Sequence, residues 1–178
     1  MSKAFTRESD SEDNAIPLPS SALPFGAKNY MTPDGAVRLR AELQRLVQEE
    51  RPQLTMAEDE GADADVVKRK VQRLDQRIQQ LEESLQSAVI TPPPESAEDR
   101  QRVAFGASVT VRRKGGEVHY RIVGVDEADP DEGWVSWPSP IARALMQARV
   151  GERVRFRFPS GEEDLEVVSV SYGAQTQA

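Results

Sequence analysis

The amino-acid sequence predicts an α+β protein with an N-terminal antiparallel coiled-coil hairpin and a C-terminal antiparallel sheet domain that carries one short helix. Apolar residues recur at every third or fourth position in the stripes at residues 39–46 and 67–88, and they alternate with polar residues after residue 102. The sequence Thr-Pro-Pro-Pro at residues 91–94 stops a helix between these two patterns. We therefore expect a tail (residues 1–28), a hairpin (29–91), a linker (92–102) and a sheet domain (103–173).

The composition limits the possible functions. With 178 residues, 38% hydrophobic and 30% charged, the chain suits an elongated protein better than one compact globule. It has no cysteine and only one histidine, His119, so any metal site must use oxygen ligands. The net charge of -7 opposes binding to nucleic acid through bulk electrostatics. No run of eighteen apolar residues and no secretory signal is present, so we expect a cytoplasmic protein without membrane contact.

The N-terminal tail, residues 1–28, is rich in Ser, Asp, Glu and Pro, and its apolar residues follow no period. We expect it to be disordered. Order should begin where Thr32 can act as a helix N-cap and Pro33 can take the first helical position. Leu39, Leu43 and Leu46 then form an apolar stripe.

The two predicted helical arms have equal length, at about 25 residues each (34–58 and 65–90). Pro52 should bend the first arm without breaking it. The second arm carries a heptad pattern formed by Val67, Val71, Leu74, Ile78, Leu81, Leu85 and Ala88. The arms should therefore pair with each other, and because no partner helix is needed we expect a monomer.

The predicted sheet domain contains two β-rich runs, 103–113 and 117–127, joined by a Gly-Gly turn. A helix should follow, with Ser139 as its N-cap, Pro140 at its first position and Gly151 at its C-terminal end. A final strand pair covers residues 152–158 and 165–172.

Five carboxylates are crowded into the turn between the two arms, residues 57–66: Glu58, Asp59, Glu60, Asp63 and Asp65. Like charges this close repel one another, and an ordinary loop would mix its charges. A solvated loop remains one explanation. The other is a site for a hard cation such as Mg²⁺, which prefers oxygen ligands.

Five segments resemble one protein family. The segments "TPDGAVRLRAELQRLVQEERP" and "LDQRIQQLEESLQSAVI" resemble the coiled coil of bacterial GreA/GreB transcript cleavage factors. The segments "FGASVTVRR", "RIVGVDE" and "SPIARALMQARVGE" resemble the C-terminal domain of the same factors. The resemblance covers residues 30 to 172 and is closer to GreB.

The resemblance implies a coiled-coil finger that enters the secondary channel of bacterial RNA polymerase, and an FKBP-like domain that anchors it. In that family the tip carboxylates help to hold Mg²⁺ at the polymerase active site, where polymerase hydrolyses backtracked RNA. The factor would then not be an enzyme itself, would contact the nascent RNA 3′ end only indirectly, and would share its Mg²⁺ with polymerase.

Residue roles follow from the matching positions. The family tip pattern Gly-Asp-x-x-Glu-Asn-x-Asp aligns with "MAEDEGAD", so that Glu60 and Asp63 would be the residues serving catalysis and metal binding. The first tip aspartate of the family falls on Ala57, for which Glu58 or Asp59 would substitute as ligands.

Two further surfaces are implied by the resemblance. Ser139, Pro140, Ala142 and Arg143 would bind polymerase. Lys68, Arg69, Lys70 and Arg73 would form a basic patch that faces RNA or polymerase. Alternatively, these cations form ion pairs along the helix and balance the acidic tip.

Two alternative functions stay open. Each arm is about one helical turn shorter than is usual for GreB, which is about 5 Å less reach, so the protein could occupy the channel without stimulating cleavage. An FKBP-like fold could also belong to a peptidyl-prolyl isomerase or chaperone. Fold does not confer function, however, and a chain with 6% aromatic residues has few with which to line such a pocket.

Overall fold

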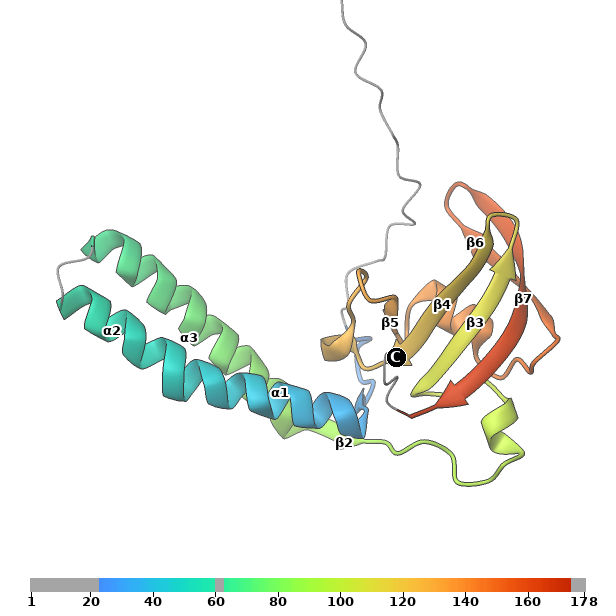
Figure 1. Cartoon of the computed structure of the whole chain (residues 1–178), viewed down its shortest axis with the longest axis horizontal. Helices are drawn as coiled ribbons and strands as arrows, with labels where there is room; N and C mark the ends of the chain where they lie inside the picture. The colour runs from blue at the N-terminus through green and yellow to red at the C-terminus, as the bar shows by residue number, and fades with distance from the viewer. Residues whose placement is uncertain (1–22, 60–62, 174–178) are drawn as a thin grey trace, which may run out of the picture.

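The structure is a computed structural model that describes residues 23–59 and 63–173, and it has two parts (Figure 1). The first part consists of β1 (Asn29–Met31), α1 (Pro33–Arg45), a π-helical segment η1 (Leu46–Glu50), α2 (Arg51–Asp59), α3 (Ala64–Ser87) and β2 (Ala88–Ile90). The second part consists of η2 (Asp99–Gln101), β3 (Ala107–Arg113), β4 (Gly116–Val123), η3 (Val125–Glu127), β5 (Trp134–Ser136), α4 (Pro140–Leu145), β6 (Arg153–Phe158) and β7 (Gly161–Tyr172).

The predicted fold class is confirmed: a helical hairpin projects as a long arm from a curled sheet with one short helix (Figure 1). Most of the tail that we expected to be disordered, residues 1–22, lies outside the described residues, as does Glu60. Within the described part of the chain, no helix is both long enough and apolar enough to span a membrane.

The interior of the hairpin is the apolar seam that the heptad pattern predicted. Leu39 and Leu46 of the first arm are buried against Leu74 and Leu81 of the second. Partly buried residues extend the same cluster: Leu43, Leu54, Ile78, Leu85 and Ala88. Burial of this seam, at about 25 cal/mol per Å² of apolar area, is the main force that holds the arms together.

Pro52 is accommodated without a break in the first arm. The five residues before α2 form a wide π turn, in which the Arg51 N–H donates to the carbonyl of Leu46, five residues earlier. An α-helix would instead place the proline ring against the carbonyl of Gln48. We expected a bend at Pro52; the irregularity that the structure shows just before it is a π turn.

The second arm ends earlier than predicted. Residues 88–90 form β2, which pairs in parallel with β1 in the register Asn29 to Ala88 and Met31 to Ile90. The Thr91 N–H then donates to the carbonyl of Met31 at 2.9 Å. The chain leaves the helix here because this strand pairing satisfies its backbone groups at the base of the hairpin.

The five strands of the sheet domain follow the order β5-β4-β3-β7-β6. All pairs are antiparallel except that the short β5 runs parallel to β4. Helix α4 covers one face, where Ile141 and Leu145 pack in the same core as Val109, Val111 and Val167.

The predicted start of α4 is correct, but its predicted end is wrong. The hydroxyl of Ser139 accepts the Ala142 N–H at 3.3 Å, and Pro140 takes the first helical position. The helix ends at Leu145 and does not continue to Gly151. The residues that follow the helix form backbone hydrogen bonds with Val103. The Gln147 N–H donates to the Val103 carbonyl, and the Val103 N–H donates to the Ala148 carbonyl, both at 2.8 Å.

Candidate functional site

The end of α2 and the start of α3, which flank the acidic turn, lie at the end of the hairpin that is farthest from the sheet domain (Figure 1). Asp63 is exposed and forms the N-cap of α3, where its Oδ1 accepts the N–H groups of Asp65 at 3.0 Å and Val66 at 3.2 Å. This capping role explains Asp63 without any metal. Glu60 lies outside the described residues; Glu58 and Asp59 belong to the end of α2, but their side chains are not described.

The tip chemistry is compatible with Mg²⁺ in one respect. Both capping bonds of Asp63 use Oδ1, and no hydrogen bond from a described residue reaches its Oδ2. An exposed carboxylate oxygen is the kind of ligand that Mg²⁺ accepts alongside water and phosphate.

The four residues of the predicted basic patch, Lys68, Arg69, Lys70 and Arg73, are all exposed on α3. Among the side chains that the structure describes, none of the four forms an ion pair. The neighbouring Arg77 differs, because it forms two hydrogen bonds, of 2.8 and 3.1 Å, with Glu42 of α1. Pairing within the described hairpin therefore accounts for Arg77 and not for the patch.

A groove of about 660 Å³ lies on the hairpin beside the π turn. Leu46, Leu54 and Leu74 line it together with Lys70 and Arg73. Lys70 and Arg73 of the basic patch therefore border this groove, and their charges lie on the hairpin surface just behind the tip.

The predicted polymerase-binding segment divides into exposed and buried residues. Pro140 and Arg143 are exposed on α4. Ser139 is 5% exposed and caps the helix, and Ala142 is fully buried in the core. In this conformation Ser139 and Ala142 support the segment from inside, so a partner would meet Pro140 and Arg143.

The junction between the hairpin and the sheet domain contains a buried carboxylate that the sequence did not single out. Glu127 in η3 is 2% exposed. Its Oε2 accepts the Thr32 N–H and the Gly124 N–H, both at 2.9 Å, and its Oε1 accepts the Thr32 hydroxyl. The only sequence signal for this contact was the role of Thr32 as an N-cap.

A second carboxylate contacts the other arm. Asp126 Oδ2 accepts hydrogen bonds from the Asn29 side chain at 3.0 Å and from the Ser84 hydroxyl. These residues line a cavity of about 330 Å³ together with Leu81 and Val125. Consecutive acidic residues of η3 thus bond to the first strand and to both arms of the hairpin.

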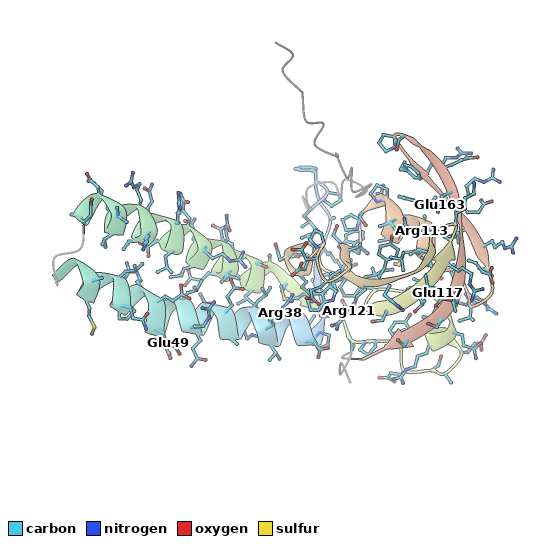
Figure 2. All side chains as sticks on the ribbon, turned by 45° about the horizontal axis from the view of Figure 1, so that its top comes forward. Arg38, Glu49, Arg113, Glu117, Arg121 and Glu163 are labelled. Carbon is cyan, nitrogen blue, oxygen red and sulfur yellow. The ribbon has the colours of Figure 1, made fainter. Side chains whose placement is uncertain are left out.

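Two arginines border the same junction, and Figure 2 shows them side by side at the base of the hairpin. The Arg38 guanidinium lies 4.3 Å from the centre of the Trp134 ring, and that of Arg121 lies 5.2 Å from it. Arg121 also pairs with Asp34 at 3.0 Å. The Arg38–Trp134 and Asp34–Arg121 contacts join α1 to the β4–β5 edge, whereas the Arg121–Trp134 contact lies within that edge.

The face of the sheet that α4 covers is closely packed. The face covered by α4 is filled by side chains that are less than 5% exposed, including Val111, Leu145 and Val167. A proline-binding site needs an open, aromatic-lined hollow. These three side chains are buried, so they do not line such a hollow.

Comparisons with known proteins agree over both parts of the chain. A family described as "Transcription elongation factor, N-terminal" matches residues 29–90, and one described as "Transcription elongation factor, GreA/GreB, C-term" matches residues 98–172. Transcription elongation factor GreB of Neisseria meningitidis serogroup A is 39% identical over 155 residues, which cover 82% of this chain and 94% of that protein. Transcription elongation factor GreA of Anaeromyxobacter sp. is 40% identical over 153 residues, covering 80% of this chain and 91% of that protein.

Two solved structures are also similar. The GreA factor homolog 1 of Thermus thermophilus is 24% identical, covers 81% of this chain and 99% of its own, and has a TM-score of 0.36. A GreA/GreB elongation factor from Nitrosomonas europaea is 21% identical, covers 82% of this chain and 100% of its own, and has a TM-score of 0.38. On the two family matches and the identity to its curated relatives, this chain belongs to the GreA/GreB family of transcription elongation factors.

Proposed function

We propose that this elongation factor binds bacterial RNA polymerase through its sheet domain and inserts the hairpin into the secondary channel, where it promotes cleavage of backtracked RNA. The observation that carries the proposal is the exposed carboxylate of Asp63, which caps the start of α3. Figure 1 shows that this end of α3 lies far from the sheet domain. The factor acts without being an enzyme itself, because its tip lends ligands to a site that belongs to polymerase.

Asp63 and Glu60 would hold the Mg²⁺ ion, and Glu58 or Asp59 would assist. When bound, such an ion activates water and neutralises charge on phosphate. The role of this chain would be to hold these carboxylates in position. The cap bonds fix Asp63 at the start of α3, so that its second carboxylate oxygen is presented to the outside.

Anchoring would come from Pro140 and Arg143, the exposed residues of α4. The basic patch Lys68, Arg69, Lys70 and Arg73 would face the nascent RNA or the channel wall, since its charges are exposed and lack described acidic partners. The hairpin buries its own seam, so the factor should act as a monomer.

A second candidate function is a channel-occupying regulator that does not stimulate cleavage. The observation that favours it is the commitment of Asp63 to capping α3, which gives this carboxylate a structural purpose of its own. A hairpin that stops short of the catalytic centre would still fill the channel, because a misplaced ligand contributes almost nothing to catalysis.

The deciding experiment adds the full-length protein to defined backtracked elongation complexes with labelled RNA. The cleavage function predicts short labelled 3′ fragments that require both Mg²⁺ and the protein. Binding to the same complexes without fragments, measured by co-purification, would replace it with the channel-occupying function. Absence of both binding and fragments would contradict the two proposals together.

A further inference from the structure

Glu127 forms a hydrogen-bonded contact between the two parts of the molecule. Its side chain is 2% exposed, and two of the three donors to its carboxylate belong to Thr32 of the hairpin. The third donor, the Gly124 N–H, comes from its own turn. A buried carboxylate costs free energy unless donors satisfy it. The sheet domain therefore has its acidic group satisfied only when the hairpin is in place.

The contact is directional. No described lysine or arginine side chain pairs with the Glu127 carboxylate, and Arg38 donates instead to the Glu127 backbone carbonyl at 3.4 Å. The donors are a hydroxyl and backbone N–H groups whose positions are fixed by secondary structure. Such bonds weaken steeply when their angles change, unlike the attraction between exposed charges.

Thr32 connects this carboxylate to the axis of the first arm. Its hydroxyl oxygen accepts the Gly35 N–H at 3.0 Å as the N-cap of α1, while its proton is donated to Glu127. The carboxylate also lies at the N-terminal end of α1, where the helix dipole favours a negative charge. Glu127 is thus bonded to the residue that caps the start of α1.

Two glycines allow the surfaces to approach this closely. A Cβ atom on Gly35 would lie 1.8 Å from Glu127 Oε1, and one on Gly124 would lie 2.3 Å from the carbonyl oxygen of Tyr30. Neither glycine has a positive φ angle. Their small size is therefore required by the contact between hairpin and sheet domain.

The position of this contact gives it leverage. Helix α3 has 24 residues. It is therefore about 36 Å long, and a rotation of about 10° at its base would move the tip by about 6 Å. From these contacts we infer that Glu127 is a positioning residue, which fixes the direction in which the hairpin projects from the sheet domain. That this direction aims the tip carboxylates at the polymerase centre rests on the proposed function.

The direction can be measured in the protein alone. The chain has no cysteine, so the double variant Gln72→Cys and Ser160→Cys can carry one spin label on α3 and one on the β6–β7 turn. We expect a narrow distance distribution between the labels. Glu127→Ala should shift or widen it by about 4 Å, because Gln72 lies about 22 Å along the helix from the base.

Three further variants separate positioning from general damage. Glu127→Gln should keep the narrow distribution, because an amide oxygen can accept both N–H groups and its NH₂ can donate to Thr32. Glu117→Ala, which removes an exposed acid from β4, should leave the distance distribution unchanged. Gly35→Ala should widen the distribution even though alanine favours a helix by about 1 kcal/mol over glycine.

If Glu127→Ala and Gly35→Ala both keep the wild-type distribution, the inference is wrong. Circular dichroism shows whether each variant is folded, and Gly35→Ala decides the matter if Glu127→Ala unfolds. A Glu127→Gln distribution as wide as that of Glu127→Ala would also overturn it, because hydrogen-bond geometry would then not be what holds the hairpin.

Cleavage supplies a separate readout. On backtracked polymerase, Glu127→Ala should lower the maximal cleavage rate about tenfold or more while the half-saturating concentration stays unchanged. Glu127→Gln should restore the rate. The distance measurement needs no polymerase, so failure of the positioning role and failure of the proposed function are distinguishable.

Discussion

The phenol hydroxyl of Tyr172, at the end of β7, donates a hydrogen bond to the backbone carbonyl of Arg102 and accepts the Ala104 N–H at 2.9 Å. These bonds attach the last strand to the segment that leads from the linker into the sheet. Burial raises the pKa of Tyr172 above its ordinary value of 10.0; the Ala104 bond opposes this increase, and the charge of Asp99 adds to it.

This shift predicts alkaline sensitivity. A group whose pKa is higher in the folded than in the unfolded state contributes stability that is complete below pH 10.0 and is lost as pH rises through the folded pKa. The free energy of unfolding, measured with urea, should therefore fall as the pH rises above about 10. Tyr172→Phe should weaken this dependence and also lower stability at neutral pH by about 1 kcal/mol.

The control for this experiment is Tyr120, whose pKa is likewise raised by burial. The Tyr172 phenol bonds to Arg102, whereas the Tyr120 phenol makes no such hydrogen bond to a described residue. Tyr120→Phe should therefore flatten the alkaline loss without the neutral-pH cost. Equal costs at neutral pH for the two variants would contradict the role assigned to the Tyr172 bonds.

The two possible roles of Asp63 can be separated by a pair of substitutions. Asp63→Ala removes both the cap and the charge, and should destabilise the start of α3 by about 1 kcal/mol. Asp63→Asn keeps a good N-cap but removes the negative charge. If Asp63 is a metal ligand, both variants should lose Mg²⁺-dependent cleavage while both still bind polymerase. Cleavage retained by Asp63→Asn and lost by Asp63→Ala would show that only the cap matters.

The π turn predicts which residue of α2 supports the hairpin. An uninterrupted α-helix would place Glu50 and Gln53 on the seam after Leu46, whereas the extra residue of the wide turn brings Leu54 there instead. Leu54→Ala should lower the free energy of unfolding by about 1.5 kcal/mol, since Leu54 is only partly buried. Gln53→Ala should change it by less than about 0.5 kcal/mol. The reverse order in urea denaturation would mean that the wide turn is not formed.

The anchor surface predicts a loss of binding without a loss of stability. Arg143 is exposed on α4, so Arg143→Ala should weaken binding to polymerase and leave the melting temperature unchanged. Arg149→Ala removes an exposed arginine just after the helix and should change neither property. Ser139→Ala should lower the melting temperature through loss of the cap. Normal binding by Arg143→Ala, in a pull-down at matched salt, would move the anchor elsewhere.

The hairpin could be predicted from sequence because its signals are local. Thr32, Pro33 and the heptad leucines determine where the arms begin and which faces pair, and the structure confirms them. The π turn could not be predicted in the same way. A proline indicates that an irregularity exists, but its form depends on which residue the opposite arm can bury.

The junction illustrates why part of the candidate site was missed. Glu127 is separated from Thr32 by 95 residues, and nothing near either residue in the sequence marks them as partners. In sequence, Glu127 looks like one more acid in a charged turn, and only the fold shows it to be 2% exposed. The segment around Ser139 could be recognised from its motif. The motif did not tell which of its residues face outward.

The parallel pairing of β1 with β2 also has a mechanical consequence. The chain enters the hairpin at Asn29 and leaves it after Ile90, and these residues lie at opposite ends of the paired strands. Tension applied between the two flanking segments therefore loads the hydrogen bonds of this ladder together, in shear, and does not peel them apart one at a time. A pull on the chain on either side of the hairpin is therefore opposed by this three-residue ladder before it reaches the arms.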